Sequence, residues 1–374
     1  MKRVVKSIYA PTRYVFVADR FSNFISVTDI VSGEHVETLN FSMRPHVMEL
    51  ARDDAMLAVG SPEVSAIEFM NLRTRERRRV ELPSPVFQIF FVPQTNLVAV
   101  GLRDQVGMIS YKDFSVRIFP RRFDSDQRQT LINTYYSLLF SSFSQSFWVL
   151  DEDRPFIYHR YGGAEPLDAP WKTIDLSRHI GTGSGLGIGV ASPEDDLLAM
   201  TTDDGSEGLV YFPAQDKVLS TGPMRTVGST NEPMIMPYID AYSKHVIFAD
   251  VTGNVALFDL VNGNGKPERF TVKFSPRFIR TGWLESTWIL AGDKGIMFQS
   301  FKDPSDRKVV RFVPEVMNMW VTGDSKTALY TLDEGAPAIY RFDIRTREQL
   351  PPIRVRGVTM ASMLRMGSNN SICY

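Results

Sequence analysis

Residues 25–39 read Ile25-Ser-Val-Thr-Asp-Ile-Val-Ser-Gly-Glu-His-Val-Glu-Thr-Leu39, and altered copies of this stretch recur along the chain. One copy begins at Val255 with Val-Ala-Leu-Phe-Asp-Leu-Val-Asn-Gly, and another begins at Ile339 with Ile-Tyr-Arg-Phe-Asp-Ile-Arg-Thr. A degraded copy beginning at Ala66 has Asn71 in place of the aspartate. Each copy is a short alternating strand, a tight polar turn and a second strand, so the chain is a β-rich repeat protein.

Short β-branched and aromatic runs fill the rest of the chain, separated by Gly, Pro, Asp and Ser at intervals of roughly 8–12 residues. They group into eight units of four strands with a period of roughly 40–47 residues, which is typical of a β-propeller. We therefore predict an all-β fold, a β-propeller of eight four-stranded blades. A ring of seven blades is the alternative if the weak fourth or fifth unit is miscounted.

The first unit runs from Val4 to Phe41, and a leftover strand at 358–364 resembles the first strand of another unit. Because a propeller ring must close, we expect this strand to pair with the first or last blade. Residues 1–374 would then form a single domain closed by N- and C-terminal strands. Small residues in the second strands, such as Gly60 and Gly101, suit close packing between blades near the axis.

The composition is that of an ordinary globular protein of 374 residues, with 43% hydrophobic residues and a formal net charge of −1. This charge argues against binding to nucleic acid or to an anionic membrane surface. No apolar run approaches the roughly 18 residues of a membrane span. The N-terminus lacks the apolar segment of a signal peptide, and the single cysteine, Cys373, excludes an internal disulfide. These features favour a cytoplasmic protein, with a periplasmic location as the alternative if a leader was removed.

The turns of the repeat have a structural explanation. Asp after a strand accepts hydrogen bonds from backbone amides further along the turn, and Gly tolerates a left-handed conformation. Asp29 with Gly33 and Asp259 with Gly263 have this form. We therefore interpret them as hairpin turns rather than catalytic residues.

Three segments resemble a known group of propellers. Tyr14-Val-Phe-Val-Ala-Asp-Arg-Phe-Ser-Asn-Phe-Ile-Ser-Val-Thr-Asp29 resembles the YVTN-type repeat. The Pro-His start of the segment 44–59, and the Ser-Pro-Glu-Asp turn after Ala191, resemble the segment that follows it in that family. The resemblance implies a WD-repeat-like propeller of the YVTN or quinoprotein amine dehydrogenase β-chain-like group. This group includes electron-transfer subunits, cofactor-handling proteins and scaffolds, so the fold does not supply the function.

Motifs that carry chemistry are scarce. The stretch Gly181–Gly189 lacks the Gly-Lys-Ser/Thr ending of a phosphate-binding loop and precedes a strand, so we interpret it as a connector. No histidine pair has metal-site spacing, and one cysteine cannot form a c-type haem motif. His46, in the Pro-His position, and His179 each precede an expected inner strand. They are the candidate ligands if a haem or metal lies on the axis, although we predict no cofactor and assign no metal or catalytic residue.

Two insertions break the repeat, near 121–135 and 161–186. The first has the pattern of a short helix capped by Asp124 or Ser125, and the second is a Pro/Gly loop with an aromatic tip. Insertions on a rigid repeat scaffold commonly form its binding face, and Trp, Tyr and Arg dominate binding hot spots. We therefore predict four protein-binding residues: Arg121, Arg122, Tyr161 and Trp171. The arginine-rich stretch 73–79 lies at a hairpin tip, where it would discourage edge pairing.

Three functions fit these observations. The first is a non-enzymatic propeller that binds protein partners as a scaffold or as a subunit of a larger assembly. The first alternative is a propeller subunit of a redox pathway associated with haem or quinone. The second alternative is a metal-dependent hydrolase resembling lactonases, with carboxylates on the axis.

Overall fold

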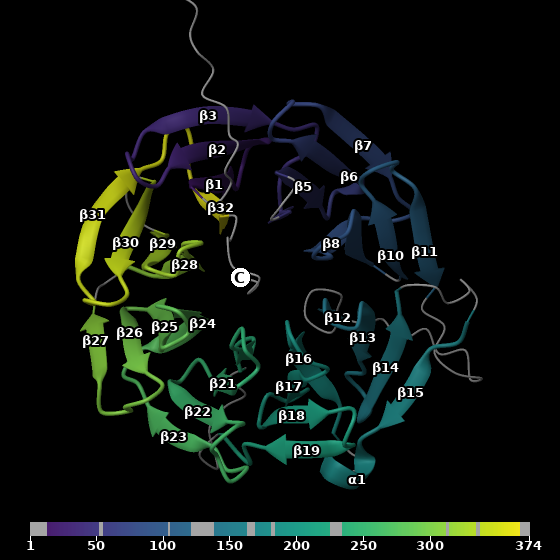
Figure 1. Ribbon diagram of the computed structural model, residues 1–374, viewed down its shortest axis with the longest axis vertical. Helices are drawn as coiled ribbons and strands as arrows, with labels where there is room; N and C mark the ends of the chain where they lie inside the picture. The colour runs from purple at the N-terminus through teal and green to yellow at the C-terminus, as the bar shows by residue number, and fades with distance from the viewer. Residues whose placement is uncertain are drawn as a thin grey trace, which may run out of the picture.

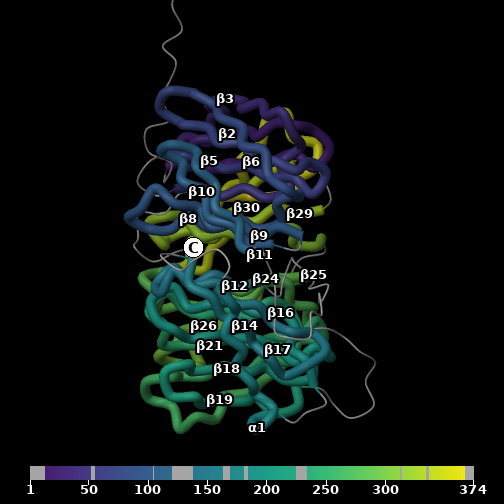
Figure 2. Tube along the Cα trace, turned by 90° about the vertical axis from the view of Figure 1, so that its right-hand side faces the viewer, coloured from purple at the N-terminus to yellow at the C-terminus, as the bar shows by residue number. Residues whose placement is uncertain are grey.

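The chain folds into a ring of eight four-stranded antiparallel sheets, the blades of a β-propeller (Figure 1). The computed structural model describes residues 13–51, 55–103, 105–120, 138–162, 169–180, 184–224, 234–311, 314–333 and 337–366. Figure 2 shows the ring edge-on, with the blades side by side. The predicted all-β fold is confirmed, and the number of blades is eight rather than seven.

The strands of each blade follow one another from the axis to the rim, except in blade 1. From the innermost strand outward, blades 1 to 4 are β32 (Ala361–Met366), β1 (Tyr14–Asp19), β2 (Phe24–Asp29) and β3 (His35–Asn40); β4 (Val47–Leu50), β5 (Met56–Ser61), β6 (Val64–Asn71) and β7 (Arg77–Glu81); β8 (Val86–Phe91), β9 (Leu97–Leu102), β10 (Gln105–Ser110) and β11 (Val116–Pro120); β12 (Leu138–Ser141), β13 (Ser146–Leu150), β14 (Phe156–Tyr161) and β15 (Lys172–Asp175). The one helix of the described residues, α1 (Ser177–Ile180), is a single turn after β15.

The second half of the ring repeats this arrangement. Blades 5 to 8 are β16 (Leu186–Ala191), β17 (Leu198–Thr202), β18 (Gly208–Phe212) and β19 (Lys217–Ser220); β20 (Tyr238–Ile239), β21 (His245–Ala249), β22 (Asn254–Asp259) and β23 (Glu268–Thr271); β24 (Ser275–Gly282), β25 (Thr287–Asp293), β26 (Gly295–Ser300) and β27 (Arg307–Arg311); β28 (Val316–Val321), β29 (Thr327–Leu332), β30 (Ala338–Asp343) and β31 (Gln349–Arg354).

Burial changes from the middle of a blade to its outer edge. Every residue of β5, a second strand, is buried, whereas Val80 alone is buried in β7 at the rim. Three exposed arginines, at positions 77 to 79, cover this outer strand. Charged side chains on an exposed edge discourage pairing with another chain, as the sequence predicts. Arg75 in the preceding turn pairs with Glu37 of blade 1 at 2.8 Å, so this turn also links two blades.

Glycines in the second strands allow neighbouring blades to approach closely. A Cβ atom on Gly60 would lie 2.9 Å from Val47 Cγ1 and 3.0 Å from Val86 Cβ in blade 3. A Cβ atom on Gly101 would lie 2.6 Å from Leu138 Cδ2 of blade 4. All three distances are shorter than van der Waals contact, so a larger residue would force the blades apart.

The first and the last strand of the described residues pair in blade 1. The strand β32 pairs antiparallel with β1, with Val15 opposite Met366 and Val17 opposite Leu364. The innermost strand of blade 1 therefore comes from the C-terminal part of the chain. The first unit was predicted to take its innermost strand from the residues that follow Val4, but this strand is β32 instead. The residues that follow Val4, up to residue 12, lie outside the described ranges. In the part of the chain that the structure describes, no helix has the length and apolar character needed to cross a membrane.

Candidate functional site

Four polar or aromatic side chains gather on the axis from neighbouring inner strands: Arg280 of β24, Trp320 of β28, Arg365 of β32 and Glu49 of β4. Inner strands of a propeller run in the same direction, and all four residues lie near the carboxyl ends of their strands. Both guanidinium groups lie against Trp320, with their Cζ atoms 5.3 Å (Arg280) and 4.5 Å (Arg365) from the ring centroid. Arg365 Nε also donates to Glu49 Oε2 at 3.3 Å. We call this group the axial arginine cluster.

The axial arginine cluster carries more positive than negative charge. Arg280 donates to the carbonyl oxygen of Ile279, and among the described residues no carboxylate lies within ion-pair distance of it. Burial lowers the pKa of Arg280 to about 10, against the opposing influence of Tyr238. The guanidinium therefore stays protonated at neutral pH. Two cations against a single aromatic ring, with one carboxylate paired to Arg365, form a site that attracts an anion.

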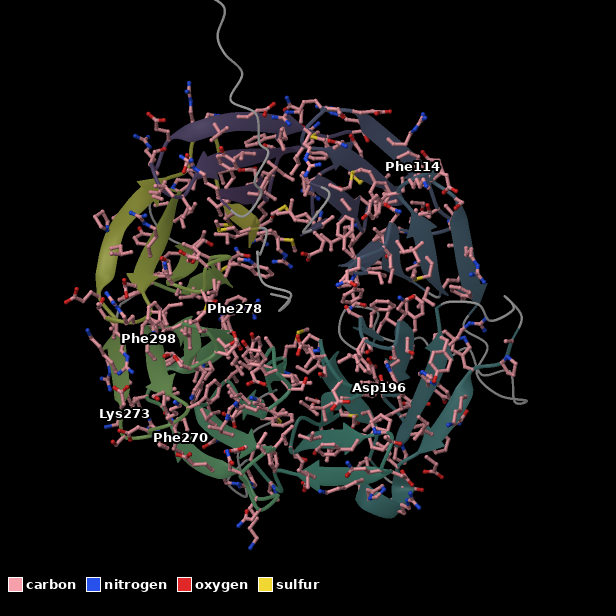
Figure 3. All side chains as sticks on the ribbon, in the orientation of Figure 1. Phe114, Asp196, Phe270, Lys273, Phe278 and Phe298 are labelled. Carbon is pink, nitrogen blue, oxygen red and sulfur yellow. The ribbon has the colours of Figure 1, made fainter. Side chains whose placement is uncertain are left out.

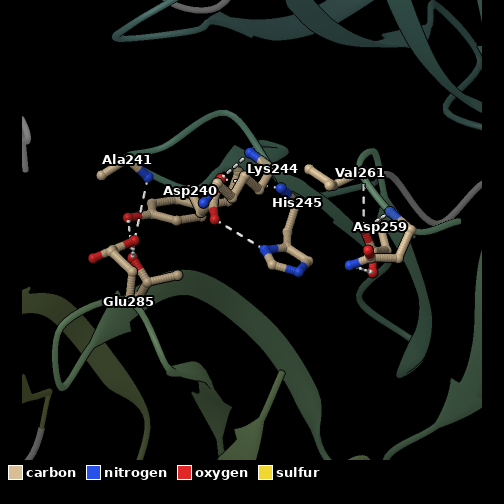
Figure 4. A network of polar contacts seen from close by, with 10 residues as sticks. Asp240, Ala241, Lys244, His245, Asp259, Val261 and Glu285 are labelled. Carbon is tan, nitrogen blue, oxygen red and sulfur yellow. Dashed lines mark hydrogen bonds and ion pairs between the residues drawn. The ribbon is translucent and has the colours of Figure 1, made fainter. Parts of the chain in front are cut away.

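A buried polar chain continues from this cluster into blades 6 and 7. Tyr238 OH lies 2.9 Å from Thr281 Oγ1, which donates to Glu285 Oε2 at 2.5 Å. The backbone amide of Ala241 donates to the same oxygen at 3.2 Å (Figure 4). Burial raises the pKa of Glu285 to about 7, and burial also raises the pKa of Tyr238. Thr281 follows Arg280 in sequence, so the chain connects the axis with the space between two blades.

A second carboxylate in the same view has a structural role. Asp240 Oδ1 accepts the backbone amides of Lys244 and His245, and Asp240 Oδ2 lies 2.9 Å from His245 Nδ1 (Figure 4). The imidazole of His245 stacks on Phe301, with ring centroids 3.9 Å apart. These contacts fix the turn between β20 and β21 and engage the side chains of Asp240 and His245.

The two histidines proposed as axial ligands do not lie together. His46 precedes β4 and is exposed, with Nδ1 3.4 Å from the carbonyl oxygen of Arg44. His179 lies in α1 at the rim of the ring, where Nε2 is 3.9 Å from Asp216 Oδ1 (Figure 1). The sequence placed His179 before an inner strand, but the helical turn keeps it at the outside of blades 4 and 5. A shared axial site formed by these two residues is therefore excluded.

The four residues predicted to bind protein do not form one exposed group in the described part of the chain. Arg121 and Arg122, with the whole insertion near 121–135, lie outside the described residues. Tyr161 ends β14 and is 48% exposed, whereas Trp171 is 4% exposed. Trp171 packs in a hydrophobic cluster with Phe119 and Phe147, so the expected aromatic tip is part of the core. Of the insertion near 161–186, residues 163–168 and 181–183 lie outside the described ranges.

The axial arginine cluster was not among the sites predicted from the sequence. One signal was present, because Arg280 interrupts the apolar inner-strand segment Phe278-Ile-Arg-Thr-Gly-Trp283. A charged residue in an inner strand is costly unless solvent or a partner charge receives it. In the described ranges, no group of three or more His, Cys, Asp or Glu side chains is arranged to hold a metal ion.

By fold and site, the protein is an eight-bladed β-propeller with a cationic cluster on its axis. No protein-family model matches the sequence, and no curated protein matches it either. Among solved structures, it is similar to the dihydro-haem d1 dehydrogenase NirN in complex with DHE, with 14% identity and a TM-score of 0.72 over 97% of this chain and 77% of that one. It is also similar to apo AztD from Citrobacter koseri, with 9% identity and a TM-score of 0.60 over 96% and 99% of the two chains. The Dos1 propeller has 10% identity and a TM-score of 0.58 over 82% of each chain. At these identities the likeness shows the propeller fold alone.

Proposed function

We propose that this protein is a cofactor-associated propeller whose axial arginine cluster binds a planar ligand bearing carboxylates. The main observation behind this proposal is that Arg280 and Arg365 both pack against Trp320, with a single carboxylate, Glu49, beside them. Guanidinium groups bind carboxylates through paired, charge-assisted hydrogen bonds. Trp320 is 5% exposed and packs against both guanidinium groups, so it fixes their positions for such a ligand. This role is the alternative that the sequence left open beside a protein-binding scaffold.

Two further points support the proposal. NirN, which has the same fold, is named for its action on a haem-type compound and was solved with a bound ligand. Haems and pyrroloquinoline quinone are both planar and carry carboxylates, and each supplies electron-transfer chemistry when bound. In this chain Arg280 and Arg365 would hold the carboxylates. His46 is the one histidine of five that directly precedes an inner strand, so it is the candidate to reach an iron atom. The relation to the YVTN and quinoprotein group remains a prediction that agrees with this role.

The test is a binding titration of the purified protein with iron protoporphyrin IX and, separately, with pyrroloquinoline quinone, followed by absorption spectroscopy. We expect one of the two to bind, and Arg280→Gln to weaken that binding at least tenfold because a charge-assisted hydrogen bond is lost. Arg311→Gln, which removes an exposed arginine from the outer strand of the same blade, is the matched control. The proposal fails if neither compound binds, or if Arg280→Gln binds as tightly as the wild type.

A protein-binding role is a second candidate, favoured by a different observation. Three turns that join an inner strand to the second strand present exposed apolar side chains: Phe143, Tyr242 and Leu284. Because these turns follow the carboxyl ends of inner strands, they lie on one face of the ring. Exposed apolar residues gathered on one face suit a protein partner. Affinity purification with the wild type and with the Phe143→Ser, Leu284→Ser double variant tests this role, because a partner bound at this face is lost from the variant alone.

A further inference from the structure

A pocket of about 710 Å³ lies between blades 4 and 5. It is lined by Trp148, His159, Tyr161 and Lys172 of blade 4 and by Asp196 and Tyr211 of blade 5. Asp196 is labelled in Figure 3 near the junction of the two blades. The volume falls within the range of pockets that hold small molecules. The axial arginine cluster contributes none of the lining, so a role for this pocket is independent of the proposed function.

One wall of the pocket is a row of side chains across blade 4. Trp148 of β13 lies directly opposite His159 of β14, and His159 lies opposite Lys172 of β15. Directly opposed residues share a face of the sheet, so all three point toward blade 5. The rings of Trp148 and His159 overlap with centroids 3.9 Å apart and planes at 31°. Tyr161 meets His159 edge-on at 4.6 Å, with planes at 81°, and forms the exposed rim.

The other wall comes from turns and strand ends of blade 5. Asp196 lies in the turn before β17, and Tyr211 lies near the end of β18. Asp216, in the turn after β18, forms an ion pair with Arg178 of α1 and so closes one side. The lining therefore carries the carboxylates of Asp175, Asp196 and Asp216 and the cations of Lys172 and Arg178. Charges of both signs are nearly balanced, which disfavours a ligand with a strong charge of either sign.

Buried polar atoms in this pocket lack partners among the described residues. They are Nε2 of His159, Nε1 of Trp148 and Oδ1 of Asp196. His159 is 8% exposed, and burial lowers the pKa of its imidazole to about 4. The neutral ring offers one donor and one acceptor, the indole offers a donor and the carboxylate offers acceptors. A buried polar group without a partner is costly, so these atoms point to a ligand with several polar groups.

We propose that the pocket between blades 4 and 5 binds a neutral, hydroxyl-rich ligand of the mono- or disaccharide class. Each sugar hydroxyl both donates and accepts a hydrogen bond, which matches the mixed donors and acceptors of Trp148, His159 and Asp196. The exposed ring of Tyr161 packs against the C–H face of a sugar ring. The balanced charges of the lining leave an uncharged ligand without an electrostatic penalty.

The experiment is a calorimetric titration of the full chain with glucose, galactose, maltose, cellobiose and lactose, with choline and acetate as charged probes. We expect saturable binding of at least one sugar and none of choline or acetate. Tyr161→Ala and His159→Phe should each weaken sugar binding at least tenfold, because the first removes the stacking ring and the second removes the polar atoms while filling the same space. Tyr242→Ala, which removes a similarly exposed tyrosine from blade 6, should bind the sugar as the wild type does.

Thermal unfolding followed by circular dichroism shows that each variant is folded, and His159→Phe keeps the test valid if Tyr161→Ala is unstable. Failure of all five sugars to bind overturns the proposal, as does tighter binding of choline or acetate. Wild-type affinity in both pocket variants overturns it as well. Arg280→Gln should retain sugar binding, so a failure at the axis and a failure at this pocket are distinguishable.

Discussion

Glu285 is a carboxyl group enclosed between blades 6 and 7, and it is 7% exposed. Its Oε2 accepts hydrogen bonds from Thr281 and Ala241, whereas Oε1 has no partner among the described residues. Burial disfavours the charged form and raises the pKa from 4.5 to about 7. Between these two values the folded protein holds a proton that the unfolded chain has released. The contribution of Glu285 to stability is therefore present below the lower value and is lost as the pH rises through the higher one.

The pH dependence of this contribution to stability can be tested with Glu285→Gln, which keeps an acceptor for Thr281 and Ala241 but does not titrate. The cost of ionising the buried carboxyl is on the order of 3 kcal/mol at alkaline pH. We expect the variant to be more resistant to guanidinium than the wild type at about pH 8, with a smaller difference at about pH 5. Glu348→Gln, at an exposed position, is the control. An unchanged pH dependence in Glu285→Gln would contradict the assignment.

The recurrent turn after an alternating strand is predicted in part by its local sequence. Asp29 Oδ1 accepts the amide of Val31 at 2.9 Å, and Asp259 Oδ1 accepts the amide of Val261 at the same distance. The aspartates thus act as predicted. The two glycines differ, because Gly33 has a φ of +73° whereas Gly263 is not left-handed. A Cβ atom on Gly263 would instead lie 2.1 Å from the carbonyl oxygen of Asp259. Local sequence predicts the turn, but the reason for each glycine depends on its three-dimensional neighbours.

The two glycines therefore respond differently to alanine. Gly33→Ala forces a left-handed alanine with no close neighbour and should cost about 1 kcal/mol. Gly263→Ala creates a clash with backbone that only a shift of the whole turn relieves, so we expect a larger loss. Guanidinium unfolding midpoints measure both, with Val261→Ala, an exposed change in the same turn as Gly263, as the control. Equal or reversed losses would show that the turn after β22 adjusts freely.

The sequence repeat predicts the ring of blades but not the candidate functional sites. The blade count and the extra strand follow from spacing, because each blade is a local unit of hairpins. The axial arginine cluster joins residues from strands far apart in sequence, so no local pattern indicates it. Trp171 was predicted to be exposed because it follows a Pro/Gly loop. In the structure its indole is buried and packs in a cluster with Phe119 of blade 3. Tyr161 was predicted as a binding residue because the repeat is interrupted near it. The pocket that Tyr161 lines is completed by Asp196 and Tyr211 of the next blade.

Because β1 and β32 pair in blade 1, we predict that the loss of β32 affects the stability of the whole ring. This strand covers β1, and its residues Leu364 and Met366 pack in a cluster with Trp320 of blade 8. Each buried side chain of this size contributes about 1.5–3 kcal/mol. A chain that ends before Val358 would expose both the inner edge of β1 and this cluster.

We expect this truncated chain to lose at least about 3 kcal/mol of stability and to elute from a sizing column as an aggregate or an expanded species. Amide hydrogen exchange should show the loss of protection first in β1, whose residues Val15 and Val17 lie opposite β32. The control is a chain that ends at Met366 and keeps the closing strand. If β1 were equally protected in both chains, pairing with β32 would not hold blade 1 in the ring, and blade 1 would have to be stabilised by its contacts with blade 2 instead.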